Sequence, residues 1–195
     1  MAKNQTALKL KGHLLIAMPG MADERFAKTV IFIASHDETG SMGFVLNQPV
    51  VEPTFSDILD ELKMKAALEN LRRLKREIPV FRGGPVEQGR GFVIHSLEAS
   101  TKSSARVDDL CAVTATLDIL KTMSGERPPA QSRMMLGYSG WSAGQLENEI
   151  AQNGWLTTKA TREIIFAESP KAQYDMALGL LGISQATLSA SAGRA

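Results

Sequence analysis

The sequence predicts one mixed α+β domain, because predicted strands come in clusters and predicted helices are scattered between them. The chain has 195 residues, of which 44% are hydrophobic and 22% charged, as in an ordinary globular domain. A folded chain of this length buries roughly 70% of the surface that the unfolded chain exposes, so it needs no metal or disulfide staple. No linker divides it. We expect a compact single domain over residues 11–188, between a flexible N-terminus (1–10) and a disordered tail (189–195).

The first strands are predicted from short apolar runs that end at turn residues. Residues 14–17 form a continuous apolar run stopped by Pro19-Gly20, which indicates a buried strand. Residues 29–35 are rich in β-branched side chains, and residues 42–46 form a further run. The polar segment 36–41 contains Gly40, so we predict a hairpin closed by a glycine-containing loop.

The segment that follows carries helical periodicity. Thr54 is placed to cap a helix, with Asp57 three residues further on. Two apolar stripes, one through Phe55 to Leu62 and one through Met64 to Leu74, do not share one face. The segment is therefore either two short helices or one helix with a break near Lys63.

The middle of the chain alternates between short strands and turns. Residues 79–82 and 91–96 are predicted strands around a glycine-rich connection at 83–90, followed by a polar excursion at 97–109. A further strand is expected at 110–115. Thr116 then caps a helix that ends at Gly125, and residues 134–137 form a short strand.

The C-terminal part begins with a predicted helix cap. Ser142 is an N-cap candidate with Gln145 at the capping-box position, and Asn153-Gly154 supply the helix stop. Residues 162–167 are predicted as a late strand. Ser169-Pro170 begins the final helix, which ends at Gly182.

Charge and cysteine content limit the class of protein. The net charge is +1, so the chain lacks the basic excess of most nucleic-acid-binding modules. Its one cysteine, Cys111, lies in an apolar run and is predicted to be a buried core residue, as is typical of a reducing cytosol. The apolar run at 14–18 is too short for a signal peptide, which needs roughly 7–15 apolar residues. We expect a cytoplasmic protein that does not contact the membrane.

The segment 140–144 (GWSAG) matches the G-x-S-x-G nucleophile elbow of α/β-hydrolases. In that fold the catalytic histidine follows the serine along the chain. Here His13, His36 and His95 all precede Ser142, so the general base is missing from its required place. A helix cap is the favoured interpretation of Ser142, and a nucleophile is the alternative.

Three other motifs are weaker. The spacing in 84–90 is similar to a phosphate-binding loop, but Arg90 and Gly91 replace the Lys and Ser/Thr of that motif, which favours a tight turn. The cluster 36–38 (HDE) is expected to be solvated, because no second cluster completes a metal site. The basic run Arg72, Arg73, Lys75 and Arg76 fits the solvated face of an amphipathic helix, and phosphate contact is the alternative. We therefore expect no metal and no cofactor.

Four segments together are similar to the YqgE/AlgH family of bacterial proteins, in the family's order and spacing: 12–19 (GHLLIAMP), 43–49 (GFVLNQP), 82–86 (RGGPV) and 136–147 (LGYSGWSAGQLE). The resemblance covers residues 11–182, and the segment 63–77 departs from it by its length. It implies a compact α+β fold with strongly bent sheets. It also implies a poorly defined activity, with some members described as regulators of transcription, and it supplies no catalytic residues.

The family-like segments hold polar side chains in glycine-rich turns, where backbone approaches backbone or ligand closely. Our hypothesis is that they converge on one shallow pocket or partner surface. The alternative is that the glycines only close turns and that Trp141 fills the core. The leading prediction is a non-enzymatic regulator that acts through a protein partner or a small ligand, with a Ser142 hydrolase second and direct DNA binding third. The candidate binding residues are Asn47, Arg82, Gly83, Gly84, Tyr138, Trp141 and Gln145.

Overall fold

The computed structural model describes residues 9–19, 21, 23–75 and 77–186. The predicted disordered tail at 189–195 lies outside these residues, and so do residues 1–8 of the predicted flexible N-terminus. Leu10 is described and packs into the core with 2% of its surface exposed. None of the helices in the described ranges has the length and apolar character that a bilayer-crossing segment needs.

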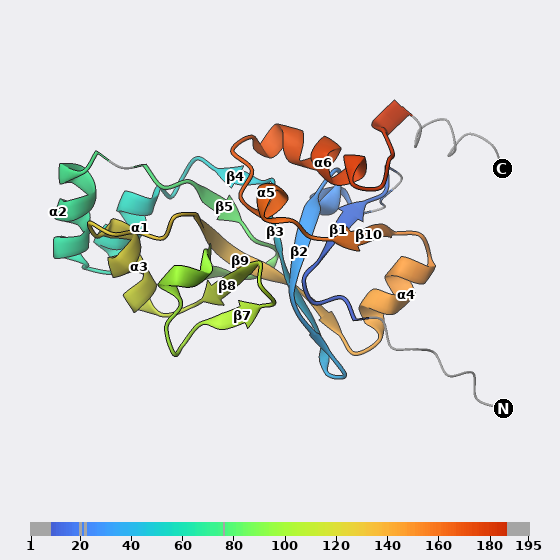
Figure 1. Ribbon diagram of the computed structural model, residues 1–195, viewed down its shortest axis with the longest axis horizontal. Coiled ribbons are helices and arrows are strands. Elements are labelled where there is room, and N and C mark those ends of the chain that lie inside the picture. Colours follow the sequence, from blue (N-terminus) through green and yellow to red (C-terminus); the bar gives the residue numbers. More distant parts are fainter. Residues whose placement is uncertain (1–8, 20, 22, 76, 187–195) are drawn as a thin grey trace.

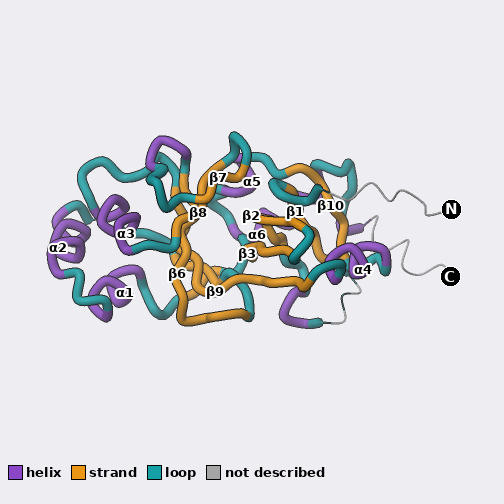
Figure 2. Tube along the Cα trace, turned by 90° about the horizontal axis from the view of Figure 1, so that it is seen from below, coloured by secondary structure: helices purple, strands orange, loops and turns teal. Residues whose placement is uncertain are grey.

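Ten strands in the described part of the chain form one curled sheet, which Figures 1 and 2 show from two directions. All the strand pairs but one are antiparallel, so the predicted α+β class with a bent, mostly antiparallel sheet is confirmed. The strands are β1 (His13–Ala17), β2 (Val30–Asp37), β3 (Gly40–Val45), β4 (Pro49–Val50), β5 (Val80–Arg82), β6 (Val86–His95), β7 (Ala105–Val107), β8 (Cys111–Thr114), β9 (Ser132–Ser142) and β10 (Trp155–Lys159).

The sheet has the order β10-β1-β2-β3-β9-β6-β8-β7, and β4 and β5 branch from it. Strand β9 has three partners: β3 and β6 are antiparallel to it, and β5 is parallel. Its early residues lie between β5 and β6, and its last four residues pair with β3. This single strand therefore joins one part of the sheet, β10-β1-β2-β3, to the other part, which contains β5, β6, β8 and β7.

Six α-helices and two short 3₁₀ helices flank the sheet in the described ranges. In Figure 1, three helices gather at one end of the molecule, one lies at the other end, and two lie along one face of the sheet. In that order they are α1 (Phe55–Glu61), α2 (Lys65–Arg73) and α3 (Leu117–Ser124), then α4 (Gln145–Ala151), then α5 (Arg162–Ile165) and α6 (Pro170–Gly179); the 3₁₀ helices are η1 (Glu24–Phe26) and η2 (Leu97–Ala99).

Strand β1 and the first half of β2 (30–33) are continuous apolar runs because both of their faces are buried. Alternate residues such as Leu14 and Phe32 join a core cluster completed by α5 and α6. Their neighbours Leu15 and Ile31 face the other way, into a cluster with two tryptophans and α4. Helices α1, α2 and α3 close a third cluster against β5, β6 and β9.

Several local predictions are confirmed. Thr54 and Asp57 form a reciprocal capping box at the start of α1. The helical segment is broken into α1 and α2, with Lys63 at a φ of 56° in the break. Ser169 accepts a hydrogen bond from the main chain of Ala172, with Pro170 as the first residue of α6.

Three strands are longer than predicted, because pairing with a neighbour extends them through polar and glycine positions. The β2–β3 hairpin runs to Asp37 and resumes at Gly40, so most of the predicted loop is strand. Strand β6 begins at Val86, inside the predicted glycine-rich connection. Strand β9 spans 11 residues, where the sequence predicts a short strand at 134–137.

The interpretation of Ser142 as a helix cap is wrong. Ser142 is the last residue of β9, where it pairs with Gly40. Gly144 is the N-cap of α4, at a φ of 74° that favours glycine. The side chain of Gln145 accepts a hydrogen bond from the main chain of Ser142, so half of the capping box is present without the serine hydroxyl.

The predicted strand at 162–167 is also wrong, because its first residues form the short helix α5. Thr161 accepts a hydrogen bond from the main chain of Ile164, and Ile164 and Ile165 face the core. Side-chain capping and burial of two neighbouring isoleucines override their β propensity. The sequence analysis also missed β10, which precedes this helix and pairs with β1, and the short strands β4 and β7.

A buried arginine links β9 to two other segments. The Arg133 guanidinium is 4.4 Å from the centre of the Phe81 ring and donates to the carbonyl oxygens of Leu46, at 2.7 Å, and Ala167. Burial lowers the pKa of Arg133 to about 10. These contacts fix the end of β3 and the start of the segment before α6 against the shared strand.

A second buried polar group is His95, at the end of β6. Its Nδ1 lies 2.9 Å from the Ser96 carbonyl oxygen, which only accepts, so Nδ1 carries the proton. Nε2 then accepts from the Thr114 hydroxyl at 2.8 Å, and that hydroxyl lies 2.7 Å from Ser104. Burial lowers the pKa of His95, and the neutral ring satisfies every partner.

We expect His95 to make stability depend on pH. The unfolded chain takes up a proton near the ordinary histidine value of about 6.5, and the native state does not. The free energy of unfolding should therefore fall as the pH drops through that value. Urea denaturation at several pH values should show a weaker dependence in His95→Gln, whose amide keeps a donor and an acceptor. His13→Gln is the control. An unchanged dependence in His95→Gln would contradict this account.

Candidate functional site

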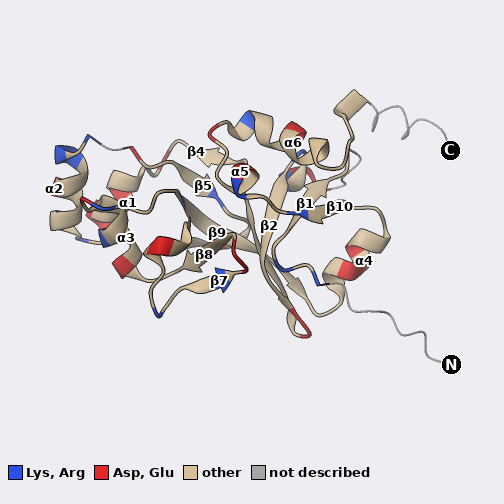
Figure 3. Cartoon of the chain, viewed as in Figure 1, with Lys and Arg blue, Asp and Glu red and all other residues tan. Residues whose placement is uncertain are grey.

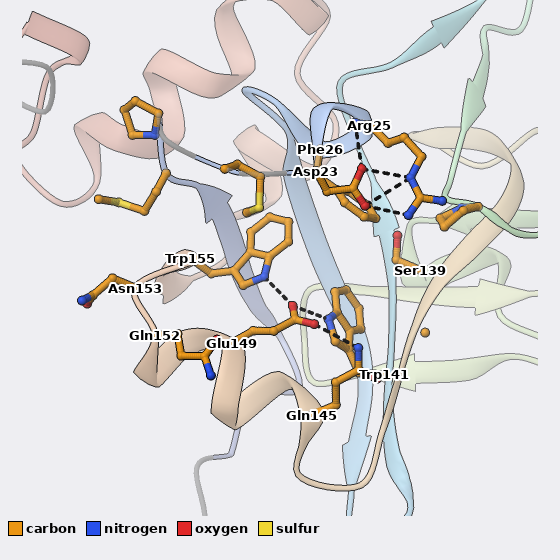
Figure 4. Close-up of a pocket in the computed structure, with 16 residues that line it drawn as sticks. Asp23, Arg25, Phe26, Ser139, Trp141, Gln145, Glu149, Gln152, Asn153 and Trp155 are labelled. Carbon is orange, nitrogen blue, oxygen red and sulfur yellow. Dashed lines mark hydrogen bonds and ion pairs between the residues drawn. The ribbon is translucent and has the colours of Figure 1, made fainter. Parts of the chain in front are cut away.

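A cavity of about 740 Å³ opens between the chain segment that follows β1, the end of β9, helix α4 and the start of β10. Its walls combine large apolar groups with a few polar side chains, as small-molecule sites do. Figure 4 shows the lining side chains. They are Met18, Pro19, Met21, Asp23, Arg25, Phe26, Pro85, Ser139, Gly140, Trp141, Gln145, Glu149, Gln152, Asn153, Gly154 and Trp155.

One carboxylate organises this cavity. Oε2 of Glu149 accepts hydrogen bonds from the indole nitrogens of Trp141 and Trp155, each at 2.9 Å. Oε1 accepts from the side-chain amide of Gln145 at 3.0 Å. Figure 4 shows the carboxylate between the two indoles. Because a buried indole N–H needs a partner, Glu149 fixes both rings at once.

The local sequence explains how these groups meet. Gln145 and Glu149 lie four residues apart on α4 and therefore share a face. The turn through Gly144 folds α4 back onto β9, and the buried side chain of Leu146 anchors it there. Trp141 and Trp155 are 8% and 5% exposed and meet edge to face, with ring centres 6.4 Å apart. The cavity wall is thus fixed by packing as well as by hydrogen bonds.

The opposite wall carries an ion pair and a third aromatic ring. The Arg25 guanidinium donates to both oxygens of Asp23, the shortest distance being 2.6 Å. Hydrogen bonding to Arg25 lowers the pKa of Asp23. Phe26 meets Trp155 edge to face, with ring centres 5.7 Å apart. Arg25 and Phe26 belong to η1, and Asp23 is its N-cap.

Two of the residues predicted for the site lie in this cavity, namely Trp141 and Gln145. Asn47 lies elsewhere: it lines a separate cavity of about 700 Å³ beside the start of α6. Its side chain accepts from the main chain of Val30 at 3.0 Å and donates to the Lys28 carbonyl at 2.9 Å. Asn47 therefore holds the start of β2 in place.

The remaining predicted residues mark a crossing of two backbones. A β-carbon on Gly83 would lie 2.2 Å from the Gly137 oxygen, and one on Gly84 would lie equally close to the main chain of Tyr138. The Tyr138 ring packs edge to face on Phe92, and Arg82 is exposed on β5. Pro85, which follows Gly84 in the chain, lines the cavity. The glycines thus set where β9 runs, and the hypothesis that all seven residues line one pocket is met only by Trp141 and Gln145.

Among the described residues, no hydrolase-like arrangement surrounds Ser142. It is exposed at the end of β9, and its main-chain N–H donates to the side chain of Gln145. The imidazole of His36 contacts a different serine, since its Nδ1 lies 2.8 Å from Ser41 Oγ. The other nitrogen of His36 lies 3.6 Å from Glu147 on α4. These contacts tie the β2–β3 hairpin to α4.

The other motifs carry structure. Arg90 pairs with Glu87 at 2.9 Å within β6, where the phosphate-loop spacing occurs. The basic residues described on α2 are exposed while Leu68 and Leu71 are buried, and Arg73 pairs with Glu126 at 3.2 Å. Figure 3 places α2 at the opposite end of the molecule from α4. No cluster of three metal-binding side chains occurs in the described ranges.

Cys111 is buried as predicted, and burial raises the pKa of its thiol to about 12. A thiol with this pKa is a poor nucleophile at neutral pH.

Sequence reasoning missed most of the cavity lining, including the three residues on which its shape and charge depend most: Phe26, Glu149 and Trp155. A signal was available for two of them. Trp155 is one of only two tryptophans in the chain, and Glu149 lies one helical turn after Gln145. Their contact with Trp141 depends on the pairing of β10 with β1, which local patterns do not reveal.

Solved structures share this fold. The solution structure of the AlgH protein from Pseudomonas aeruginosa matches with a TM-score of 0.76 and 36% identity, over 100% of both chains. A crystal structure of a protein from Corynebacterium diphtheriae matches with a TM-score of 0.61 over 89% of this chain and 86% of that one. At 19% identity, the second shows the fold alone.

The chain belongs to the AlgH-like family, which it matches over residues 14–186. A UPF0301 protein of Rhizobium etli is 50% identical over 186 residues, which cover 94% of this chain and 92% of that protein. A UPF0301 protein of Agrobacterium fabrum is 48% identical over 185 residues, with the same coverage. The predicted family is thereby confirmed.

The close backbone crossing at Gly83 leads to a prediction about stability. We expect Gly83→Ala to lower the free energy of unfolding by about 1–3 kcal/mol, because the new methyl group forces β9 away. Gly89→Ala is the matched control, since nothing lies within 4 Å of the added carbon. Urea denaturation of both variants measures the difference. Equal stability of the two variants would show that the crossing is not tightly constrained.

Proposed function

We propose that this protein is a ligand-binding module whose cavity, between β9, α4, β10 and the segment after β1, takes a small organic molecule. The observation that carries the proposal is the fixing of two tryptophans by one carboxylate, at 2.9 Å each. A wall held in this way is formed before a ligand arrives, so little conformational freedom is lost on binding. The volume, about 740 Å³, falls within the usual range for ligand pockets.

The proposal includes a regulatory role in the cytoplasm. Binding at the cavity would be relayed to a protein partner, and any effect on transcription would be indirect. Membership of the AlgH-like family supports a regulator of this kind, through the resemblance on which the sequence-based prediction rests. The single reduced cysteine supports a reducing compartment.

A hydrolytic activity at Ser142 is not the function that the geometry favours. Hydroxyl nucleophiles need a base within hydrogen-bond reach, and the imidazole on this side of the sheet contacts Ser41 instead. The basic residues of α2 lie on a helix that packs against the core through its leucines, as a solvated face does. Neither feature adds a second candidate function.

If the cavity binds a small molecule, binding should change both the tryptophan fluorescence and the melting temperature. Both tryptophans of the chain line the cavity, so a bound ligand should change the intrinsic fluorescence directly. A ligand at about 100 times its dissociation constant stabilises the fold by about 2.7 kcal/mol. The melting temperature should then rise by roughly 5–10 °C. A metabolite library screened for both signals tests the proposal.

Two phenylalanine-to-alanine variants distinguish an effect on ligand binding from an effect on stability. We expect Phe26→Ala, in the cavity wall, to weaken binding of a hit. Phe166→Ala, at a partly buried ring that packs against the core cluster outside the cavity, should lower the melting temperature and leave affinity unchanged. Hits that raise the melting temperature without changing the fluorescence, or that bind Phe26→Ala as tightly as the wild type, would count against this cavity.

A further inference from the structure

The hydrogen bonds on Glu149 leave one acceptor position open. A carboxylate accepts about four hydrogen bonds, two on each oxygen. Oε2 is filled by the two indoles, and among the described residues Oε1 accepts from Gln145 alone. The donors that the described residues supply to Glu149 are all neutral. Its negative charge is therefore fixed in the cavity wall without a protein cation beside it.

The other charged groups of the wall balance each other. Asp23 and Arg25 are paired at 2.6 Å through both carboxylate oxygens, so the guanidinium is already occupied. With that pair neutral, Glu149 gives the cavity a net negative charge. An anionic ligand would meet this charge without a free cation to offset it.

The aromatic rings favour a positive charge as well. Trp141, Trp155 and Phe26 all line the cavity, and indole is the side chain that attracts cations most strongly through its face. Both indole N–H groups donate to the Glu149 carboxylate. The negative charge of this acceptor makes the indole rings more electron-rich. Met18 and Met21 add adaptable apolar surface for the body of a ligand.

We propose that the ligand class of this cavity is a protonated primary amine on an apolar or aromatic body. The ammonium group donates to the open position on Oε1 of Glu149, and the apolar body packs against the tryptophans and methionines. A quaternary ammonium has no N–H for this position and is disfavoured. This inference rests on the proposed function, since it assigns a chemistry to the same cavity.

The test uses three small probes of similar shape and different charge: 2-phenylethylamine, 2-phenylethanol and phenylacetate. Each is titrated into the full chain at neutral pH while tryptophan fluorescence is followed. We expect the amine to bind at least about tenfold more tightly than the alcohol, with phenylacetate weakest. The preference should shrink as salt is added, because only the charged contact is screened.

Two variants connect the preference to Glu149. Glu149→Gln keeps a carbonyl acceptor for the indoles and removes the charge, so most of the amine's advantage over the alcohol should be lost, and only the part that the aromatic faces supply should remain. Glu69→Gln, an exposed change on α2, is the control and should keep the preference. If Glu149→Gln does not fold, the salt dependence of the wild-type chain still decides the outcome.

The outcomes separate the two proposals. If the alcohol or phenylacetate binds as tightly as the amine, the cavity is confirmed as a ligand site and the amine assignment is wrong. If the preference is undiminished in Glu149→Gln, the assignment is also wrong. If no probe changes the fluorescence, the amine assignment falls, and the metabolite screen then decides whether the cavity binds ligands at all.

Discussion

The pairing of β9 with three strands is the constraint on which the rest of this structure depends. Its early residues lie between β5 and β6, and its late residues pair with β3. The buried Arg133 on this strand reaches the carbonyl oxygens of Leu46 and Ala167, and Gly83 lets the β5–β6 connection lie directly on it. The strand therefore delivers Trp141 to a fixed place at the far end, where α4 folds back and the cavity opens.

At that end, one side chain accepts hydrogen bonds from three donors that would otherwise need separate partners. An indole N–H buried without a partner costs free energy, and here both indoles and an amide share the Glu149 carboxylate. The arrangement gives the wall its shape and its charge together. It also ties α4 to β9, which precedes it in the chain, and to β10, which follows it.

Local chemistry made much of the fold predictable. The Thr54–Asp57 box, the break at Lys63 and the Ser169-Pro170 start need only neighbouring residues, and each is confirmed. Features that depend on pairing across the sheet were not predictable. The local sequence around Ser142 predicts a helix cap, but the pairing with Gly40 makes it a strand residue. The isoleucines of α5 predict a strand, but capping by Thr161 starts a helix there. The same holds for the site, where Trp141 and Gln145 stand out but Glu149 gains its meaning only once β10 brings Trp155 beside it.

Hydrogen exchange of the two indole N–H groups, followed by NMR, tests the central claim most directly. The chain has two tryptophans, so the spectrum contains two indole signals, and a Trp155→Phe variant assigns them. If Glu149 holds both rings, both indole protons exchange slowly with solvent in the wild-type chain, and both lose protection together in Glu149→Ala. Rapid exchange of either proton in the wild type, or loss of protection at one ring alone, would contradict the account.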